Sequence, residues 1–503
     1  MELLLDRRSS LPAYMQIRNH LREQILQGEI SPGTRLPPER ELARRLGVSR
    51  TTVVSAYDEL TAEGLVEAHR GRGTTVLGPA AALGETVQPI AWPVHFSSLA
   101  QRLRGPASAE MSALRDLSAQ PGVLSFATGT PDPTLTPRAR FHEAWAAVLQ
   151  QVGVEALASS PIQGIAPLRD LIVERMAQRG IVANRDNVVV VSGSQQGLDI
   201  LVRLLTEPGD TVVAEAPTYY GALQTFQAQG LRVIGIPVDA QGMDVDSVEQ
   251  TLTRYRPRLI YTIPNYQNPT GVTLSPNRRA KLLELSQRYG VPIIEDDPFG
   301  DLPFQGPPPT PIKALDPCGH VIYLSTFSKS LAPGLRIGWF TGPRPVVEMA
   351  ILLKRVVDLQ ANSAGQYLVV EFARRGWLAE GIAAARSVYG RRCAAMDAGL
   401  QAHLPDGACW APPQGGLFLW LELPELLSAH RLLTETGAQG VVFLPGSILY
   451  PSSGPRNGCR LNFSARTEAQ IAQGTEVMGR ALAKLVQGQA SANAADSAAS
   501  AVV

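Results

Sequence analysis

The sequence has little cysteine and almost no net charge. Only four cysteines occur among 503 residues, and they stand far apart, at Cys318, Cys393, Cys409 and Cys459. This number and spacing exclude a disulfide framework and give no metal-ligand cluster. Lysine and arginine together number 46, against 45 for aspartate and glutamate, so no overall field draws the chain to nucleic acid or to a membrane. Any contact with DNA must be local.

Long apolar runs are absent as well. The opening residues, MELLLDRRSS, hold three consecutive leucines before charge begins, which is too short for a signal peptide or a membrane anchor. No later run approaches the ~20 apolar residues of a membrane span. We therefore expect a cytoplasmic protein with no membrane partner. A hydrophobic content of 45% and a charged content of 18% indicate globular domains, and the length predicts two or three of them.

A first domain, expected over residues 1–78, is dense in helix signals. Apolar residues of YMQIRNHLREQILQGEI fall near one helical face. In LPPERELARRLGVSRTTVVSAYDELTAEGLV, Pro38 opens a second helix that Gly47 ends, and Ser49 caps a third. LVEAHRGRGTTVLG then predicts two short strands around an Arg-Gly turn.

A linker and a larger domain are predicted next. GPAAALGETVQPIAWP has several glycines and prolines that break helices and strands, and its apolar residues follow no sustained period. We therefore expect a linker over residues 79–115. Over residues 116–486, apolar strands such as NVVVV, RLIYTIP and VPIIEDD alternate with helices, which predicts an α/β domain with a parallel-rich sheet covered on both faces. After Trp377 a separate strand group, including GLFLWLEL, indicates a smaller C-terminal subdomain. Residues 487–503 are low in complexity and are expected to be disordered.

Lys329 stands in LSTFSKSLAPGLRIGW among hydroxyl and apolar side chains, whereas a solvated lysine usually has polar neighbours. A buried lysine loses proton affinity and becomes a nucleophile able to bind an aldehyde, most often pyridoxal 5′-phosphate (PLP). PLP also needs a phosphate cradle and an acidic partner for its ring nitrogen. Candidates are present for both needs. They are Thr326, Ser328 and Arg336 beside the lysine, Gly193, Ser194 and Gln195 at a strand-to-helix junction, and Asp296 and Asp297 at a strand end.

Five stretches resemble the fold-type I aminotransferases in order and rough spacing: SGSQQG, PNYQNPTG, IIEDDPF, STFSKSLAPGLRIG and CRLNFSA. They look most like the branch containing the aminoadipate and kynurenine enzymes. The resemblance implies that Lys329 forms a Schiff base with PLP and that Asp296 pairs with the pyridine N–H. It further implies roles for Asn268 at the ring hydroxyl, Tyr219 stacked on the ring, Arg460 on an incoming α-carboxylate, and Ser194, Gln195, Thr326, Ser328 and Arg336 on the phosphate.

Several of these roles have a plainer alternative. Asn268 could cap a turn before the following proline, and Tyr219 could be an ordinary core residue. Arg460 could form a plain ion pair. Asp297 could be the ring partner, although similarity to the family's EDD run favours Asp296.

Two positions depart from the family pattern. Three residues after the ring aspartate the family usually has a tyrosine that donates to the cofactor's ring oxygen, and this chain has Phe299. Five residues before the glycine of PIQG the family usually has a tyrosine that reaches the phosphate across the dimer, and the alignment places Ser159 there. With both phenols absent, PLP attachment is still expected, but efficient transamination is not.

The first domain resembles the winged helix-turn-helix of the GntR family over nearly its whole length. The start of its third helix would contact base edges in the major groove, and two arginines of the preceding helix would contact the DNA phosphates. Two arginines of the wing would enter the minor groove. The expected DNA-binding residues are therefore Arg40, Arg44, Ser49, Arg50, Thr51, Thr52, Arg70 and Arg72. The arginines of the preceding helix could instead be an ordinary solvated face.

A GntR-type reader linked to an aminotransferase-like domain is similar to the MocR subfamily of bacterial transcription regulators. This resemblance implies PLP as cofactor, a head-to-tail homodimer, double-stranded operator DNA as partner, and PLP or an amino compound as effector. One rival interpretation is an active aminotransferase with an appended regulatory DNA-binding domain, which Phe299 and Ser159 argue against. Another is a DNA-binding protein whose second domain is a cofactor-free dimerisation scaffold, which Lys329, Asp296 and Arg336 argue against.

Overall fold

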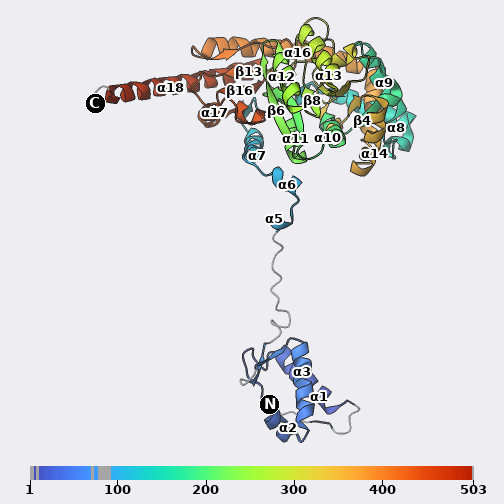
Figure 1. Cartoon of the computed structure of the whole chain (residues 1–503), viewed down its shortest axis with the longest axis vertical. Coiled ribbons are helices and arrows are strands. Elements are labelled where there is room, and N and C mark those ends of the chain that lie inside the picture. The colour runs from blue at the N-terminus through green and yellow to red at the C-terminus, as the bar shows by residue number, and fades with distance from the viewer. Residues whose placement is uncertain (1–4, 7–10, 70–72, 78–91, 501–503) are drawn as a thin grey trace. The chain divides into compact units, whose positions relative to one another are not determined.

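The structure is a computed structural model that describes residues 5–6, 11–69, 73–77 and 92–500. The chain divides into two compact units, Met1–Phe96 and Ser97–Val503 (Figure 1). Within the described ranges, no helix combines the length and the apolar character that crossing a membrane requires.

The first unit packs helices against a two-stranded wing, which confirms the predicted winged helix-turn-helix. Its elements are α1 (Ala13–Leu26), α2 (Glu39–Leu46), α3 (Arg50–Ala62), β1 (Val66–His69), β2 (Gly73–Val76) and α5 (Trp92–His95). Gly47 ends α2 at φ 65°, a left-handed conformation that favours glycine. Ser49 accepts a hydrogen bond from the Thr52 amide and so caps α3. β1 and β2 pair antiparallel, and residues 70–72, for which a turn was predicted, lie outside the described residues.

The second unit starts earlier in the chain than the sequence predicted. Helices α6 (Ser98–Arg102) and α7 (Pro106–Ser118) belong to it, although residues 79–115 were expected to be a linker. The Arg102 guanidinium donates two hydrogen bonds to the Ala228 carbonyl, at 3.1 and 2.8 Å, and the Gln227 amide donates to the Arg102 carbonyl at 2.6 Å. These contacts reach more than a hundred positions along the chain, so the local sequence gives no sign of them.

The large sheet of this unit has eight strands in the order β4-β11-β10-β9-β8-β5-β6-β7. Neighbours among β10, β9, β8, β5 and β6 run parallel, whereas β11 and β7 run antiparallel to their neighbours. The strands are β4 (Val188–Val191), β5 (Thr211–Ala216), β6 (Arg232–Asp239), β7 (Gly242–Met243), β8 (Leu259–Thr262), β9 (Ile293–Asp296), β10 (Val321–Thr326) and β11 (Gly338–Thr341). This sheet confirms the parallel-rich α/β prediction.

Helices cover both faces of the sheet, as its continuously apolar strands predict. Val189 and Val191 of β4 pack with α10, α11 and α14 on one face, while Val188 and Val190 pack with α9 and α15 on the other. Helices α12 and α13 extend that second layer. The helices are α8 (Arg138–Gln151), α9 (Ala166–Ala177), α10 (Ser194–Leu205), α11 (Tyr220–Gln229), α12 (Val245–Tyr255), α13 (Pro276–Tyr289), α14 (Arg344–Val357) and α15 (Ser363–Arg374).

The predicted smaller subdomain is built on a second sheet, in the order β12-β13-β16-β15. Its elements are α16 (Trp377–His403), β12 (Cys409–Trp410), β13 (Phe418–Glu422), α17 (Ala429–Gly437), β15 (Leu444–Pro445), β16 (Gly458–Asn462) and α18 (Glu468–Ser500), with β14 (Val441–Val442) paired to β3 (Leu124–Ser125). Figure 1 shows α16 and α18 side by side. Short 3-10 helices occur at Pro133–Leu135, Gly153–Leu157, Arg185–Asn187, Ile312–Leu315, Pro333–Leu335 and Gly446–Leu449.

Helix α18 corrects one expectation. It continues to Ser500, although residues 487–503 were expected to be disordered. The segment is rich in alanine, the residue with the highest helix propensity, and it extends a helix that packing has already nucleated. Low complexity was therefore a poor guide to the backbone here.

Candidate functional site

The residues named from the motifs line one cavity of about 940 Å³ in the second unit. Most of them follow the carboxyl ends of neighbouring strands, where ligands of open α/β sheets bind, whereas Arg336 precedes β11 and Arg460 comes from β16 of the second sheet. Those residues are Ser194, Gln195, Tyr219, Asn268, Asp296, Thr326, Ser328, Lys329, Arg336 and Arg460. The fold therefore brings together all ten side chains for which the sequence predicted a cofactor or carboxylate role.

Lys329 lies in the tight turn that follows β10. The turn forms because the Thr326 hydroxyl accepts a hydrogen bond from the Ser328 amide at 3.1 Å. The Lys329 ammonium donates to the Gly129 carbonyl at 2.7 Å. Burial, together with the nearby charges of Arg460 and Arg336, lowers the pKa of Lys329 to about 8. More of the unprotonated, nucleophilic amine is therefore present at neutral pH than for a solvated lysine.

Asp296 is the last residue of β9 and is buried. Its Oδ2 accepts a hydrogen bond from the Tyr261 hydroxyl at 2.7 Å, whereas its buried Oδ1 has no hydrogen-bond partner among the described residues. Burial raises the pKa of Asp296 to about 7, since few groups around it offset the lost solvation. A positively charged N–H in the cavity would supply both the missing hydrogen bond and the missing counter-charge.

Asp297, the alternative ring partner, faces a different environment and does not line this cavity. Its Oδ2 accepts from Arg179 at 2.6 Å and from the Tyr323 hydroxyl at 2.8 Å. Burial by itself would raise the pKa of Asp297, but the Arg179 charge and these hydrogen bonds bring it below the usual value. Oδ1 of Asp297 is also buried without a hydrogen-bond partner among the described residues, but Arg179 already supplies the counter-charge. The geometry therefore favours Asp296 for a ligand in the cavity.

A phosphate-sized anion would find its donors where β4 leads into α10. Gly193 precedes the helix at φ 91°, and a Cβ there would lie 2.4 Å from Nη2 of Arg336. That guanidinium donates to the Ser192 carbonyl at 3.0 Å, which holds it beside the first turn of α10. Free N–H groups at a helix start and a guanidinium form an anion site together. Ser328 lies within 3.5 Å of the same guanidinium.

Gln195 and Tyr219 meet around Gly221 at the start of α11. The Gln195 amide donates to the Gly221 carbonyl at 3.1 Å and to the Thr225 hydroxyl at 2.9 Å, so its side-chain donors hold α11 rather than a phosphate. A Cβ on Gly221 would lie 2.5 Å from the Tyr219 hydroxyl, so only glycine leaves room for that ring. Burial raises the pKa of Tyr219 to about 12, which keeps the phenol neutral.

Arg460 projects from β16 and is buried without an ion pair in the described part of the chain. Its guanidinium donates to Asn268 Oδ1 at 2.9 Å and to the Ala127 carbonyl at 2.6 Å, and it lies 4.2 Å from the centre of the Phe418 ring. Its Nε is buried and has no hydrogen-bond partner among the described residues. Burial lowers the pKa of Arg460 to about 10. This geometry argues against the plain ion pair and suits a carboxylate from outside the protein.

The two positions that depart from the family differ in their surroundings. Phe299 lines the cavity and is buried, with its ring edge-on to Phe418 at 5.6 Å between centres. Ser159 is exposed, in the stretch between a 3-10 helix and α9, and is not among the residues that line the cavity.

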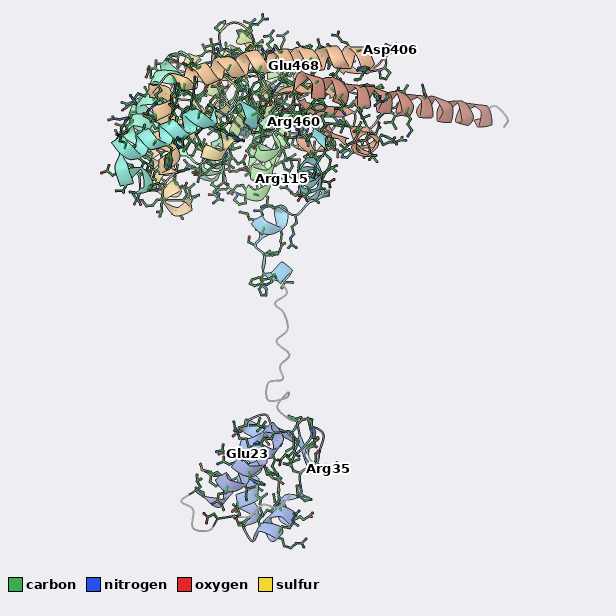
Figure 2. The ribbon with its side chains drawn as sticks, turned by 180° about the vertical axis from the view of Figure 1, so that it is seen from behind. Glu23, Arg35, Arg115, Asp406, Arg460 and Glu468 are labelled. Atoms are coloured by element: carbon green, nitrogen blue, oxygen red, sulfur yellow. The ribbon has the colours of Figure 1, made fainter. Side chains whose placement is uncertain are left out.

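Sequence reasoning missed one wall of the cavity. Helix α7 contributes Ser108, Ser112 and Arg115, and Figure 2 labels Arg115 and Arg460. It also missed Tyr261, the hydrogen-bond donor to Asp296. The spacing of the serines and the arginine on α7 fits one helix face, but nothing in the sequence near residues 106–118 resembles a site motif.

The predicted DNA-binding residues that the structure describes lie on α2, on α3 or between the two helices. Arg40, Arg44, Ser49, Arg50 and Thr51 are exposed, and Thr52 is half-buried. Arg50 forms an ion pair with Glu39 at 2.8 Å, a contact that the sequence did not predict. Arg70 and Arg72 lie outside the described residues.

Known proteins match both units. Residues 122–478 match the family described as aminotransferase class I and II, and residues 13–76 match bacterial regulatory proteins of the gntR family. The chain is 31% identical to the uncharacterized HTH-type transcriptional regulator YisV of Bacillus subtilis, over 96% of this chain and 98% of that protein. It is 32% identical to the probable rhizopine catabolism regulatory protein MocR of Rhizobium meliloti, over 92% of both chains.

A solved structure is similar to the second unit. The α-aminoadipate aminotransferase LysN of Thermus thermophilus, in complex with N-(5′-phosphopyridoxyl)-L-leucine, is 33% identical, with a TM-score of 0.74 over 79% of this chain and 100% of that chain. Two family matches in this order, with similarity to regulators along nearly the whole chain, settle the family. The chain belongs to the GntR-family transcriptional regulators that carry a domain of aminotransferase class I and II, the architecture that it shares with MocR.

Proposed function

We propose that this regulator binds PLP through Lys329 and that PLP, or an amino compound reacting with it, controls DNA binding by the first unit. The class I and II aminotransferase fold is PLP-dependent. The observation that supports binding by this chain is the buried, unpartnered Oδ1 of Asp296 in the same cavity as the lysine and the anion donors. A pyridinium N–H fits that oxygen, and a phosphate fits the start of α10.

When bound, PLP supplies an electron sink for reactions of amines. In the proposed site Asp296 holds the proton on the ring nitrogen, and Tyr219 covers the ring. Asn268 donates to the ring hydroxyl. Ser194, Thr326, Ser328 and Arg336 hold the phosphate, with Gln195 contributing its backbone rather than its side chain. Arg460 binds the α-carboxylate of an amino acid.

The partners of the first unit follow from its architecture. A GntR-type helix-turn-helix implies DNA as ligand. In the proposed regulator, Arg40 and Arg44 contact phosphates, Ser49, Arg50, Thr51 and Thr52 contact base edges, and Arg70 and Arg72 contact the minor groove. We further propose that the protein acts as a head-to-tail homodimer in the cytoplasm, since two readers would then bind two half-sites of an operator.

Borohydride reduction followed by peptide mapping tests the cofactor proposal. Reduction of the PLP-loaded protein should fix the cofactor to the single peptide that contains Lys329, and Lys329→Ala should lose this labelling. Lys484→Ala, an exposed lysine of α18, is the matched control and should label as the wild type does. Labelling at another lysine would contradict the assignment. Footprinting upstream of its own gene, with and without PLP, tests the regulatory part.

An active aminotransferase is the second candidate, favoured by the intact Lys329, Asp296 and Arg460 of the cavity. Phe299 argues against it, because the ring cannot donate to the cofactor's oxygen. Turnover of amino acids and keto acids at about 1 per second or more, an ordinary enzyme rate, would support the aminotransferase and exclude a regulator without turnover.

A further inference from the structure

Lys354 is a charged residue on the buried face of α14. This helix packs on α10, and its buried residues Val347, Ala350 and Lys354 recur at helical spacing. Val347 and Ala350 belong to an apolar core of the sheet, but Lys354 is fully buried as well. Its ammonium donates to Oδ1 of Asp358, one turn further on, at 2.5 Å. Because a buried ion pair often stabilises a fold no more than apolar residues in its place, this pair points to another role.

Asp358 connects this lysine to the turn between β4 and α10. Its Oδ2 accepts a hydrogen bond from the Gln196 amide at 2.8 Å and a longer one from the Ser192 hydroxyl at 3.3 Å. The Gln196 side-chain oxygen in turn accepts from the backbone N–H of Ser192 at 2.7 Å. The Ser192 carbonyl is the group that holds the Arg336 guanidinium. One carboxylate therefore fixes the turn that carries the donors of the proposed phosphate site.

The charge of this carboxylate conflicts with the site that it supports. Gln196 lies in the first turn of α10, where the proposed function places a phosphate. A negative charge bonded to that turn would repel the phosphate, because charges inside a protein interact over several ångströms with little screening. Lys354 supplies a positive charge at the other oxygen of Asp358. The hydrogen bonds to Asp358 are thus kept while its repulsion is offset.

We propose that Lys354 and Asp358 are positioning residues of the phosphate site, in which Lys354 neutralises Asp358 so that Asp358 can hold the β4–α10 turn without repelling the anion. The inference rests on the proposed function, because it requires the phosphate of PLP at the start of α10. Neither side chain is among the described residues that line the cavity, so both act through Ser192 and Gln196 rather than by touching the cofactor.

The experiment compares PLP with pyridoxal, which has the same ring and aldehyde but no phosphate. The full-length protein, freed of PLP, is titrated with each compound, and attachment to Lys329 is followed by visible absorbance. In Lys354→Gln the new amide can still donate to Asp358, but the positive charge is lost. This variant should bind PLP about tenfold more weakly than the wild type, as expected for an uncompensated charge near a phosphate, and should bind pyridoxal unchanged. Lys354→Met, which also removes the donor, should lose at least as much PLP affinity.

Two further variants separate charge from packing. Lys354→Met/Asp358→Asn removes both charges, and the asparagine oxygen can still accept from Gln196, so most of the lost PLP affinity should return. Lys313→Met is the matched control, because Lys313 forms another mostly buried ion pair, with Asp316, and is not among the described residues that line the cavity. It should keep the wild-type ratio of PLP affinity to pyridoxal affinity.

The outcomes separate this inference from the function on which it rests. A wild-type protein that takes up no PLP overturns the proposed function itself. PLP uptake by the wild type, with equal losses of PLP and pyridoxal binding in Lys354→Gln, would show that the pair maintains the fold and would overturn the inference alone. An unchanged ratio in Lys354→Gln and Lys354→Met would do the same. So would a double variant that binds PLP no better than Lys354→Met.

Discussion

In the proposed cofactor site, Phe299 affects how strongly the ring oxygen of PLP is held. It lines the cavity at the position where the resemblance to the aminotransferases implies a tyrosine, and its ring packs against Phe418. Because phenylalanine donates no hydrogen bond, nothing at this position favours the ionised ring oxygen. The nitrogen that joins Lys329 to the cofactor should therefore hold its proton to higher pH than in an aminotransferase with the phenol.

The variant Phe299→Tyr tests this relation. Its hydroxyl can point into the cavity, donate to the ring oxygen and lower the pKa of the joining nitrogen. The visible absorbance change of the PLP-loaded protein should then occur at lower pH than in the wild type, and any transamination should rise. Phe299→Leu is the control, since it changes the packing without adding a donor. An unchanged titration in Phe299→Tyr would contradict the role given to this position.

The residues of the cavity show what sequence could predict and what it could not. Lys329, Asn268 and Arg460 stand in short motifs, so their meeting in one cavity was predictable. The choice between Asp296 and Asp297 needed coordinates, because it depends on Arg179 and Tyr323, which lie 118 and 26 positions away from Asp297. The unpartnered Oδ1 of Asp296 could not be predicted for the same reason. Tyr261, which donates to the other carboxylate oxygen, lies 35 positions away along the chain.

Among the elements, α2 and α3 carry the predicted contacts to DNA. Replacing Arg50 by alanine should weaken binding to the operator by about 1–3 kcal/mol if its side chain reads a base. The structure adds a competing interaction, because Glu39 accepts hydrogen bonds from Nε and Nη2 of Arg50. Glu39→Ala should therefore strengthen binding to DNA of any sequence by removing a negative charge and freeing the arginine.

The variant Arg40→Ala is the comparison for Arg50→Ala and Glu39→Ala. Arg40→Ala should weaken binding to operator and random DNA alike, and should flatten the dependence of affinity on salt, because a phosphate contact carries no sequence information. Electrophoretic mobility shifts at several salt concentrations measure both effects. Equal losses on operator and random DNA for Arg50→Ala would show that another part of α3 reads the bases.

Helix α6 is held to the end of α11 by Arg102. Removing its two hydrogen bonds to the Ala228 carbonyl in Arg102→Ala should cost about 1 kcal/mol locally, which corresponds to about fivefold more frequent opening. Hydrogen exchange of residues 98–105 should speed up accordingly, while the large sheet exchanges as before. Arg138→Ala serves as control. Unchanged exchange would mean that Leu99 and Leu103 hold the segment without the arginine.

Two elements were predicted wrongly for opposite reasons. The breakers in GPAAALGETVQPIAWP suggested a linker as far as residue 115, but long-range contacts with α11 order the chain from α6 onward. The alanine-rich end of α18 suggested disorder from its composition, although alanine also favours helix where a nucleus exists. In both cases the local sequence pattern was outweighed by a distant partner or by the preceding helix.

The strands of the large sheet could be predicted, because burial on both faces of a strand leaves an apolar run in the sequence. This holds for β4, β5, β8, β9 and β10.

At the scale of the whole molecule, the division into two units predicts two unfolding transitions. PLP binds only the second unit in the proposed function, so it should raise only that unit's transition temperature. At a free concentration of 100 times the dissociation constant the stabilisation is about 2.7 kcal/mol. Scanning calorimetry with and without PLP measures this, and Lys329→Ala should reduce the shift. A single transition, or equal shifts of both, would contradict independent units.

The anchor of Arg102 on α11 also limits the tether between the second unit and the reader in each protomer of the proposed dimer. While the anchor holds, residues 97–105 stay with the second unit and add no length to that tether. Release of α6 would add these residues, at most ~30 Å of extended chain, to the tether of each protomer. Since the second reader binds at an effective concentration set by tether length, the same operator would be held less tightly, and operators with wider half-site spacing would come within reach.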